Sequence, residues 1–404
     1  MATVKPQTLK GFRDFLPQEA RKRQYVIDIL KKVFESYGFE PLETPALEYE
    51  EILIGKYGEE GDKLMYRFVD RGNRKVALRY DQTVPLARVV AQYQNELLMP
   101  FKRYQIQNVW RADNTQKGRF REFMQCDIDT VGSMSSLADS EIIACVITAI
   151  KKLGFKKITM NINDRDVFVG IETKYMTIID KLPKIGQEAV KKELTKSMSE
   201  KEAQKILDDL LNQKLTTKIA QIFSYLKSLG FTQDIDFIFD QTIVRGLDYY
   251  TGTIFELVDP KNPSLSLGGG GRYDKLIGMF SNKQIPAVGF SFGFDRLIDA
   301  MTELKLFPDD LQATKVLVTV FSSELLEKSL EVSSYLRSNN INTELYLDEN
   351  SKMEKQLKYA DKKGIPYAII IGPDEASKNM ITLRNMKTRE QESVSLEKAF
   401  SKLF

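Results

Sequence analysis

The chain of 404 residues contains no histidine, and this absence excludes several kinds of chemistry. Ser-His-Asp and Cys-His catalysis, histidine general bases and histidine metal ligands all require an imidazole side chain. The only two cysteines are Cys126 and Cys145, which rules out a disulfide framework and a thiolate zinc cluster. Any catalysis must therefore use carboxylates, arginine, lysine, tyrosine or a bound cofactor.

Long apolar runs are also missing. No segment approaches the length of a membrane helix, and the N-terminus carries Lys5 and Lys10 without the apolar stretch of a signal peptide. We therefore expect a cytoplasmic protein with no membrane partner. Excess charge of one sign is absent too, because 59 basic residues face 56 acidic ones, so net charge gives little help for or against a nucleic-acid partner.

The length predicts two or three domains, at roughly 100–200 residues per domain. Strand patterns of the first part lie at 64–69, 75–80, 101–111, 120–131, 156–162, 237–239, 251–257 and 287–292. Helical patterns lie at 19–37, 83–98 and 137–153. Residues 165–230 are rich in Lys, Glu and Gln with helical spacing, which predicts a helical insertion within a larger sheet domain spanning 1–310.

Residues 306–310 have the composition of a linker, and the pattern beyond them changes to strand-helix alternation. Strands are expected at 315–320, 343–347, 367–371 and, as the last one, 380–383, with helices at 324–338 and 352–363. This alternation predicts a separate small α/β domain at 315–404. The whole chain is therefore predicted to be α+β, with an antiparallel-sheet domain carrying an insertion and then a small α/β domain.

The segment 101–132 is the richest in polar chemistry and reads as strand, loop, strand. Period two places Phe123, Gln125, Asp127 and Asp129 on one face of the second strand, with Met124, Cys126 and Ile128 on the other. Since the apolar face must pack on helices, the polar face is left for a cleft or for solvent. Four arginines, at 103, 111, 119 and 121, suggest a polyanion such as a triphosphate; solvated charges on an edge hairpin explain them about equally well.

Three glycine-containing segments each allow a ligand site or an ordinary structural element. The sequence RGLDYYTG at 245–252 places a cation near Tyr249 and Tyr250, although a turn with packed tyrosines is favoured by the pattern alone. The four glycines at 268–271 allow close backbone approach to a ligand, or a flexible turn. The sequence GFSFGFDR at 289–296 places Arg296 near a helix start, which suits an anion or simply a tight strand-helix corner.

Asp81 and Thr83 lie near the start of a predicted helix. The structural interpretation is a helix cap, because both residue types favour that position. The functional interpretation is a carboxylate and a hydroxyl that bind an ammonium group. The two interpretations can hold together.

Taken together, these segments resemble the histidyl-tRNA synthetases, a family of class II aminoacyl-tRNA synthetases, over essentially the whole chain. The opening KGFRDFLP at 10–17 belongs to this likeness. The sequence GFEPLETP at 38–45 is similar to class II motif 1, whose proline lies at the dimer interface. VWRAD at 109–113 with GRFREF at 118–123 is similar to motif 2, and 289–296 to motif 3. RGLDYY at 245–250 is similar to a signature special to the histidine enzymes, and the last domain resembles their anticodon-binding domain.

The resemblance implies roles for individual residues. Arg111 and Arg296 would hold the α- and γ-phosphates of ATP, and Phe123 would stack on adenine. Arg245 would sit beside the α-phosphate and the substrate carboxylate. Further contacts near the phosphates and the tRNA acceptor stem would come from Arg119 and Arg121, with Glu122 also at ATP. The amino group and backbone of histidine would be bound by Asp81, Thr83, Gln125 and Asp129, and the imidazole pocket would be lined by Tyr249 and Tyr250. The family can have Glu in place of Asp81 and Asp129.

The implied reaction activates L-histidine with ATP and Mg²⁺ and transfers it to the 3′ end of histidine tRNA, in a homodimer without a structural metal. Arg245 and Arg111 would neutralise the two anions that must meet, and no enzyme base is needed because the attacking carboxylate is already ionised. One alternative is the non-catalytic relative that regulates ATP phosphoribosyltransferase, which usually lacks the last domain. A second alternative is an RNA-sensing or scaffold protein derived from a synthetase.

Overall fold

The computed structural model describes residues 4–115, 118–168, 171–244, 249–259, 262–308 and 311–403. The chain divides into two compact units, Met1–Phe307 and Pro308–Phe404. The division falls within the segment 306–310 that the sequence indicates as a linker.

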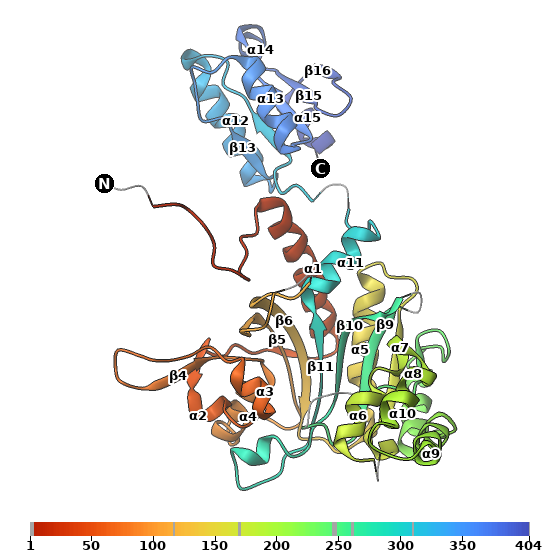
Figure 1. The fold of residues 1–404 in the computed structure, drawn as a ribbon. Coiled ribbons are helices and arrows are strands. Elements are labelled where there is room, and N and C mark those ends of the chain that lie inside the picture. The colour runs from red at the N-terminus through yellow and green to blue at the C-terminus, as the bar shows by residue number, and fades with distance from the viewer. Residues whose placement is uncertain are drawn as a thin grey trace. The chain divides into compact units, whose positions relative to one another are not determined.

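The first unit is built on an eight-stranded sheet with the strand order β1-β5-β6-β11-β10-β9-β7-β8 (Figure 1). Neighbouring strands are antiparallel except for the two outer pairs, β1–β5 and β7–β8, which are parallel. The strands are β1 Glu40–Pro41, β5 Phe101–Trp110, β6 Glu122–Val131, β7 Thr159–Asp164, β8 Phe237–Phe239, β9 Thr253–Asp259, β10 Asn262–Arg272 and β11 Ala287–Gly293. The predicted α+β class, with a mainly antiparallel sheet, is confirmed.

The four glycines at 268–271 lie inside the central strand β10 and pair with both β9 and β11, so the flexible-turn interpretation is wrong. The strands run so close here that a Cβ atom on Gly270 would lie 2.0 Å from the carbonyl oxygen of Gly289. Glycine is therefore required by the close approach of the backbones. The strand was missed because residues without side chains give no alternating hydrophobic pattern.

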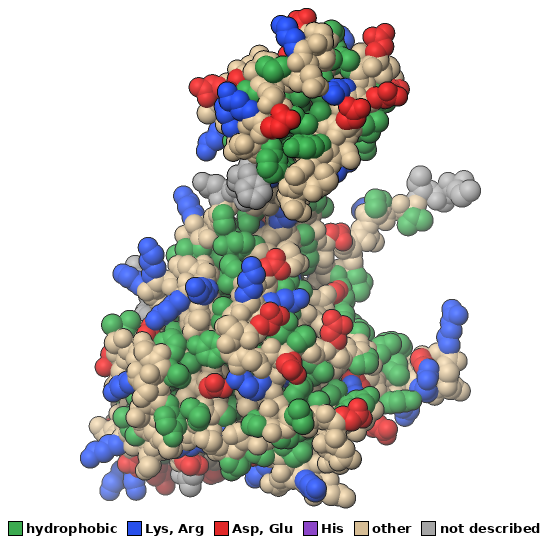
Figure 2. All heavy atoms as spheres, turned by 180° about the vertical axis from the view of Figure 1, so that it is seen from behind, with side chains coloured by type: hydrophobic (Ala, Val, Ile, Leu, Met, Phe, Trp, Pro, Cys, Tyr) green, Lys and Arg blue, Asp and Glu red, His purple; other side chains and the backbone are tan. Residues whose placement is uncertain are grey.

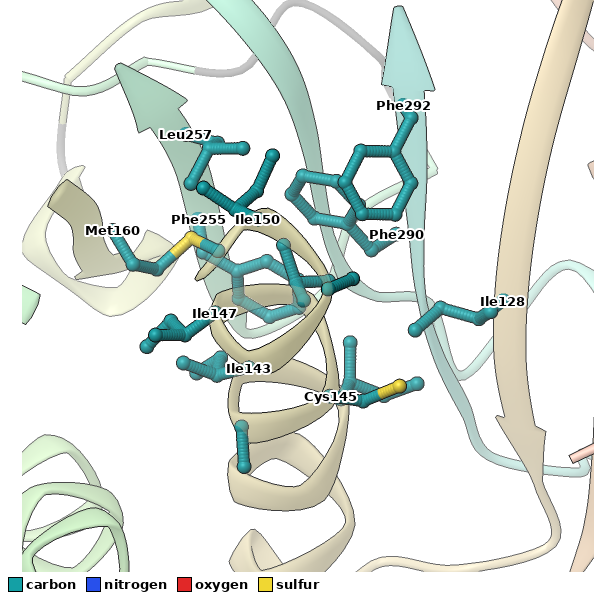
Figure 3. Close-up of a cluster of buried hydrophobic side chains, with 14 of the residues drawn as sticks. Ile128, Ile143, Cys145, Ile147, Ile150, Met160, Phe255, Leu257, Phe290 and Phe292 are labelled. Atoms are coloured by element: carbon teal, nitrogen blue, oxygen red, sulfur yellow. The ribbon is translucent and has the colours of Figure 1, made fainter. Parts of the chain in front are cut away.

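One face of the main sheet is covered by helices. These are α1 Pro17–Ser36, α5 Ser136–Lys152, α10 Thr217–Ser228 and α11 Phe294–Glu303. Figure 3 shows how Ile143, Ile147 and Ile150 of α5 face Phe255 and Phe290 of the sheet, within the largest buried apolar cluster of the described residues. Burial of this apolar surface stabilises the packing of helices on sheet.

Helix α1 ends where the sequence predicts. Gly38 has φ +76°, and the N–H groups of Gly38 and Phe39 donate to the carbonyls of Glu35 and Phe34, each at 3.0 Å. This is the Schellman arrangement that a glycine after the last helical residue permits.

The opposite face of the main sheet carries a smaller sheet and a group of helices. The smaller sheet is antiparallel with the order β2-β4-β3, from Leu47–Tyr49, Lys75–Leu78 and Arg67–Val69. Short helices α2 Glu50–Leu53 and α3 Gly58–Lys63 and the longer α4 Thr83–Gln92 accompany it. Together with the insertion described next, they form a second buried apolar cluster that includes Tyr250 and Tyr273.

Between β7 and β8 the chain forms a group of helices, as the composition of 165–230 indicates. They are the short 3₁₀ helix Arg165–Phe168, α6 Thr173–Ile179, α7 Leu182–Ile185, α8 Gln187–Leu194, α9 Glu200–Leu211 and α10. Figure 1 shows them gathered beside the β9 side of the sheet. Helix α9 begins with a capping box, in which Ser199 and Glu202 bond to each other's backbone N–H groups.

The second unit contains a five-stranded sheet with the order β13-β12-β14-β15-β16, of which the first three strands are parallel. Its elements are β12 Val316–Val318, α12 Leu326–Ser338, β13 Thr343–Leu345, α13 Met353–Lys363, β14 Tyr367–Ile370, α14 Pro373–Ser377, β15 Ile381–Asn385, β16 Gln391–Val394 and α15 Leu396–Leu403. The expectation that the strand near 380–383 is the last one is wrong, because β16 pairs with it as a hairpin.

Charged side chains of both signs are spread over the surface. On the face that Figure 2 shows, Lys and Arg are interspersed with Asp and Glu, in keeping with the small net charge of +3. Of the helices in the described part of the chain, none has the length and apolar character needed to cross a membrane.

Candidate functional site

A cavity of about 350 Å³ lies in the first unit, on the polar face of β6. Gln125, Asp127 and Asp129 of this strand line the cavity, whereas Cys126 and Ile128 point into the helical core on the other side. Period two predicts this division for residues 125–129, whereas Met124, expected on the apolar face, also borders the cavity. The floor of the cavity is rich in carboxylates.

Asp129 is held in the floor by two partners. Its Oδ2 lies 2.6 Å from Nη2 of Arg103, which is fully buried on the adjacent strand β5, and Tyr273, directly after β10, donates a hydrogen bond from its hydroxyl to Oδ1. Burial raises the pKa of Asp129, while the charge of Arg103 and the bond from Tyr273 lower it. A buried guanidinium of this kind offsets the cost of placing a carboxylate in a site of low dielectric constant.

Asp81 lies at the N-terminal end of α4 and also lines the cavity. Its Oδ1 accepts the backbone N–H groups of Thr83 and Val84, both at 3.1 Å, and the hydroxyl of Tyr57 at 2.8 Å. Burial raises its pKa. Asp81 thus supports the start of the helix and faces the cavity, so the two interpretations of this position hold together.

Tyrosines form one wall. The ring of Tyr249 lies 4.9 Å from that of Tyr250 and 5.8 Å from that of Tyr273, centre to centre. Tyr249 is hydrogen-bonded to Thr83, and burial raises its pKa well above the usual value, so its hydroxyl stays protonated. Such a wall offers apolar faces together with hydroxyl donors and acceptors.

The other end of the cavity carries guanidinium and aromatic groups. Arg111 follows β5 and donates from Nε to the carbonyl of Tyr80 at 3.0 Å, with its Cζ 4.4 Å from the Tyr80 ring centre and 5.2 Å from that of Phe123. Arg296 is exposed in the first turn of α11, and its Nη1 donates to the carbonyl of Ser266 at 3.2 Å. Guanidinium groups and a helix N-terminus together suit an anionic ligand.

Most of the residues singled out in the sequence lie around this one cavity. Its lining includes Asp81, Thr83, Arg111, Arg119, Phe123, Gln125, Asp129, Tyr249, Tyr250 and Arg296. Segments distant in the sequence, around residues 81, 111, 125, 250 and 296, therefore meet at one place. Arg245 lies outside the described residues.

Two of the predicted ATP-binding residues are placed differently and do not line the cavity. Arg121 bonds from Nε to the carbonyl of Asp113 at 3.1 Å, and its backbone N–H donates to Gly11. Glu122 accepts a bond from Asn108 of β5 at 2.7 Å. Both side chains form hydrogen bonds within the β5–β6 hairpin. Their contacts with ATP remain a prediction.

Several lining residues were not selected from the sequence: Tyr57, Tyr80, Asp127, Tyr273 and Ser291. Asp127 carried a signal, because it shares the polar face of its strand with Gln125 and Asp129. Ser291 lies within the glycine-containing segment 289–296, and Tyr273 follows the four glycines by two residues. Tyr57 has no such signal, since only the folded chain brings its hydroxyl to Asp81.

A metal site is not formed by the protein groups alone in the described part of the chain, where no three Asp, Glu or Cys side chains cluster as ligands.

The sequence models of two families match the chain. That of histidyl-tRNA synthetase covers residues 11–297, and that of an anticodon-binding domain covers 315–403. The cavity and all its lining residues fall in the first match. The second match lies within the small α/β unit.

Individual relatives agree. The histidine–tRNA ligase of Flavobacterium johnsoniae is 40% identical, over 97% of this chain and 98% of its own. The crystal structure of histidyl-tRNA synthetase from Nostoc sp. PCC 7120 superposes with a TM-score of 0.87 at 31% identity, covering 99% of each chain. An ATP phosphoribosyltransferase regulatory subunit/histidyl-tRNA synthetase from Bacillus halodurans is similar in fold, with a TM-score of 0.72 at 23% identity, and covers 89% of this chain and 97% of its own.

Proposed function

Because the chain belongs to the histidyl-tRNA synthetase family, we propose that it is a histidine–tRNA ligase. It activates L-histidine with ATP to histidyl-adenylate and transfers the histidyl group to the 3′ end of histidine tRNA. The observation that carries this proposal is one cavity that joins a carboxylate- and tyrosine-lined end to an arginine- and phenylalanine-lined end. An amino acid and a nucleotide can therefore lie beside each other.

Histidine occupies the carboxylate end. Asp81, Thr83, Gln125 and Asp129 bind its amino group and backbone, and Tyr249 and Tyr250 line the pocket of its imidazole. Hydrogen bonds to both ring nitrogens would reject apolar amino acids strongly, because a ligand lacking them leaves buried polar groups unpaired.

ATP occupies the arginine end, with Mg²⁺ carried by its phosphates. Phe123 stacks on adenine, while Arg111 and Arg296 hold the α- and γ-phosphates. Arg119 also lines this end and is about half exposed, with 53% of its side chain accessible, so it can reach phosphate or the tRNA acceptor stem. The pairing of guanidinium with phosphate oxygens provides both charge and orientation.

The first step is attack by a carboxylate oxygen of histidine on the α-phosphorus, with departure of pyrophosphate. Arg111, together with Arg245, neutralises the two anions and stabilises the charge that spreads over the equatorial oxygens. No enzyme base is required. In the second step the terminal ribose hydroxyl of the tRNA attacks the carbonyl carbon, a phosphate oxygen takes its proton and AMP leaves.

We also propose a homodimer formed through the smaller sheet. An exposed apolar surface follows this sheet and the end of α4, made by Leu47, Tyr49, Phe68 and Tyr93, which are 39–52% exposed. Pro45, Leu47 and Tyr49 also border a second cavity of about 780 Å³. A contiguous apolar patch of this kind on a folded unit is typical of an interface.

The two units have different functions. Residues 1–310 form the catalytic domain, with 165–230 as an insertion, and residues 315–404 bind the anticodon. A translation enzyme of this kind works in the cytoplasm. The regulatory relative is less well supported, because it usually lacks a C-terminal anticodon-binding domain, which this chain has.

The test is ATP–pyrophosphate exchange with the full chain. We expect exchange that depends on histidine, followed by charging of histidine tRNA. Binding of tRNA without histidine-dependent exchange would contradict the proposal and favour an RNA-sensing or regulatory role.

A further inference from the structure

Asp127 is a buried carboxylate of the cavity that the family resemblance does not use. Its side chain is 2% exposed and lies on β6, opposite Gln105 of β5 and Ser291 of β11. Within the part of the chain that the structure describes, its Oδ1 has no hydrogen-bond partner. A buried carboxylate oxygen without a hydrogen bond destabilises the folded protein, because its desolvation is not offset. The missing donor therefore points to a ligand.

The charges around Asp127 are unbalanced. Asp81, Asp127 and Asp129 line the same cavity, and among the described residues the cation that lowers the pKa of Asp127 is Arg103. Arg103 is already paired with Asp129 at 2.6 Å. Both Asp81 and Asp129 act in the opposite direction and raise the pKa of Asp127. The floor therefore has an excess of negative charge that a cationic ligand would neutralise.

The position of that cation is indicated by neighbouring groups. The negative charges of Asp81 and Asp127 both raise the pKa of the Tyr249 hydroxyl, so the two carboxylates lie in one region of the cavity. Gln125, two residues before Asp127 on the same face, also has a buried oxygen, Oε1, without a hydrogen-bond partner in the described structure. An ammonium group offers three N–H donors and one positive charge, whereas a neutral imidazole offers one N–H donor and no charge.

We propose that Asp127 is a further histidine-binding residue, whose Oδ1 accepts a hydrogen bond from the α-ammonium group of the substrate, with Gln125 and Asp81 as the other acceptors. This inference rests on the proposed function, since it concerns the amino-acid end of the same cavity. It assigns two carboxylates to one ammonium group, so recognition of the amino group depends on charge as well as on geometry.

The arrangement makes histidine binding sensitive to pH. Without a bound ligand, burial raises the pKa of Asp127 to about 7, although the charge of Arg103 and the hydrogen bond with Ser291 lower it. The groups that face it are Arg103 on β5, Asp129 on β6, Ser291 on β11, and Asp81 and Tyr249 across the cavity. An ammonium group stabilises the ionised form, so binding near neutral pH expels a proton from Asp127.

The experiment compares three ligands by calorimetry: L-histidine, histidinol, which keeps the ammonium group without the carboxylate, and imidazolepropionate, which lacks the ammonium group. In Asp127→Asn we expect affinity for histidine and histidinol to fall at least about tenfold, with imidazolepropionate changed by less than about twofold. An equal loss for all three ligands, or no loss, would overturn the inference. Asp164→Asn is the matched control, because Asp164 is also buried with an oxygen lacking a partner but does not line the cavity.

A second measurement needs no variant. With the natural chain near neutral pH, titrations in buffers of different ionisation enthalpy should show protons released on binding histidinol and not on binding imidazolepropionate. The same release with both ligands would overturn the inference. Pyrophosphate exchange by the wild type separates failure of the proposed function from failure of this inference. If the wild type shows no exchange, the proposed function is wrong. If the wild type exchanges and Asp127→Asn binds histidine unchanged, only the role given to Asp127 is wrong.

Discussion

Gly289 of β11 stands opposite Asp129 of β6, so close that a Cβ atom on Gly289 would lie 1.8 Å from Oδ1 of Asp129. The absence of a side chain on one strand thus sets the position of a carboxylate on the next. This is the carboxylate that also receives Arg103 and Tyr273.

Gly289→Ala should therefore damage the amino-acid end of the cavity. The new methyl group displaces Asp129 from its partners, and we expect the KM for histidine in pyrophosphate exchange to rise at least about tenfold, with a smaller change for ATP. Gly278→Ala is the control, because its nearest neighbour would be the flexible side chain of Gln284 at 3.3 Å, away from the cavity. An unchanged histidine KM in Gly289→Ala would show that this carboxylate does not position the substrate.

The N-terminal segment contacts residues at the end of the cavity proposed to bind ATP. Arg13 lies 3.0 Å from Asp295, the residue before Arg296, and its Cζ sits 3.2 Å from the ring centre of Phe120. Both partners line the cavity. Arg13→Ala should loosen the two walls together and raise the KM for ATP by about 3- to 30-fold, with less effect on histidine. Lys22→Ala removes a pair with Glu19 and a contact with the Phe307 ring, neither of which lines the cavity, and should change neither constant. Equal KM changes for ATP and histidine in Arg13→Ala would argue for general destabilisation instead.

Asp127 should limit stability at alkaline pH. Its folded-state pKa of about 7 lies above the ordinary value of 3.8, so the folded chain holds this proton more tightly than the unfolded chain. The resulting stability is fully present below the ordinary value and is lost as pH rises through about 7. Asn imitates the protonated acid, so Asp127→Asn should stabilise the protein above neutral pH, by at most about 4 kcal/mol at 1.36 kcal/mol per pKa unit. Thermal unfolding at acid and alkaline pH measures this, and an identical difference at both would contradict it.

The apolar surface of the smaller sheet predicts the effect of a charge placed there. Phe68→Asp, at a position that is 48% exposed on β3, should shift a homodimer toward monomer, since a charge buried at an interface costs several kcal/mol. Light scattering over a concentration series measures the mass. Leu347→Asp in the second unit is the control, because Leu347 is 93% exposed and is not part of the smaller sheet. A monomeric wild-type chain would contradict the dimer outright.

Local patterns predicted much of the fold because they depend on neighbours in sequence. The period of two on β6 separates Asp127 from Cys126, and the structure places the first in the cavity and the second in the core. The end of α1 at Gly38 follows equally from local backbone chemistry. Strand β10 could not be predicted this way, because its glycines are explained by the backbone of β11 and not by their own sequence.

The site was predictable only in part. Residues such as Arg111 and Tyr250 belong to segments of unusual composition, and the family resemblance drew attention to them. The sequence does not indicate Tyr57, because this residue belongs to the site through one hydrogen bond to Asp81, 24 residues away. For Arg121 and Glu122 the resemblance implies contacts with ATP, which stay a prediction; the structure shows their polar atoms bonded to Asp113 and Asn108.

The central claim is that one cavity joins histidine to ATP, and the most direct test is pyrophosphate exchange by the wild-type chain and by Arg111→Ala. We predict exchange in the wild type only when histidine is supplied, and a fall of at least about 100-fold in kcat for the variant, because Arg111 offsets the charge of the reacting groups. Exchange that does not need histidine, or an Arg111→Ala variant that exchanges at the wild-type rate, would contradict it.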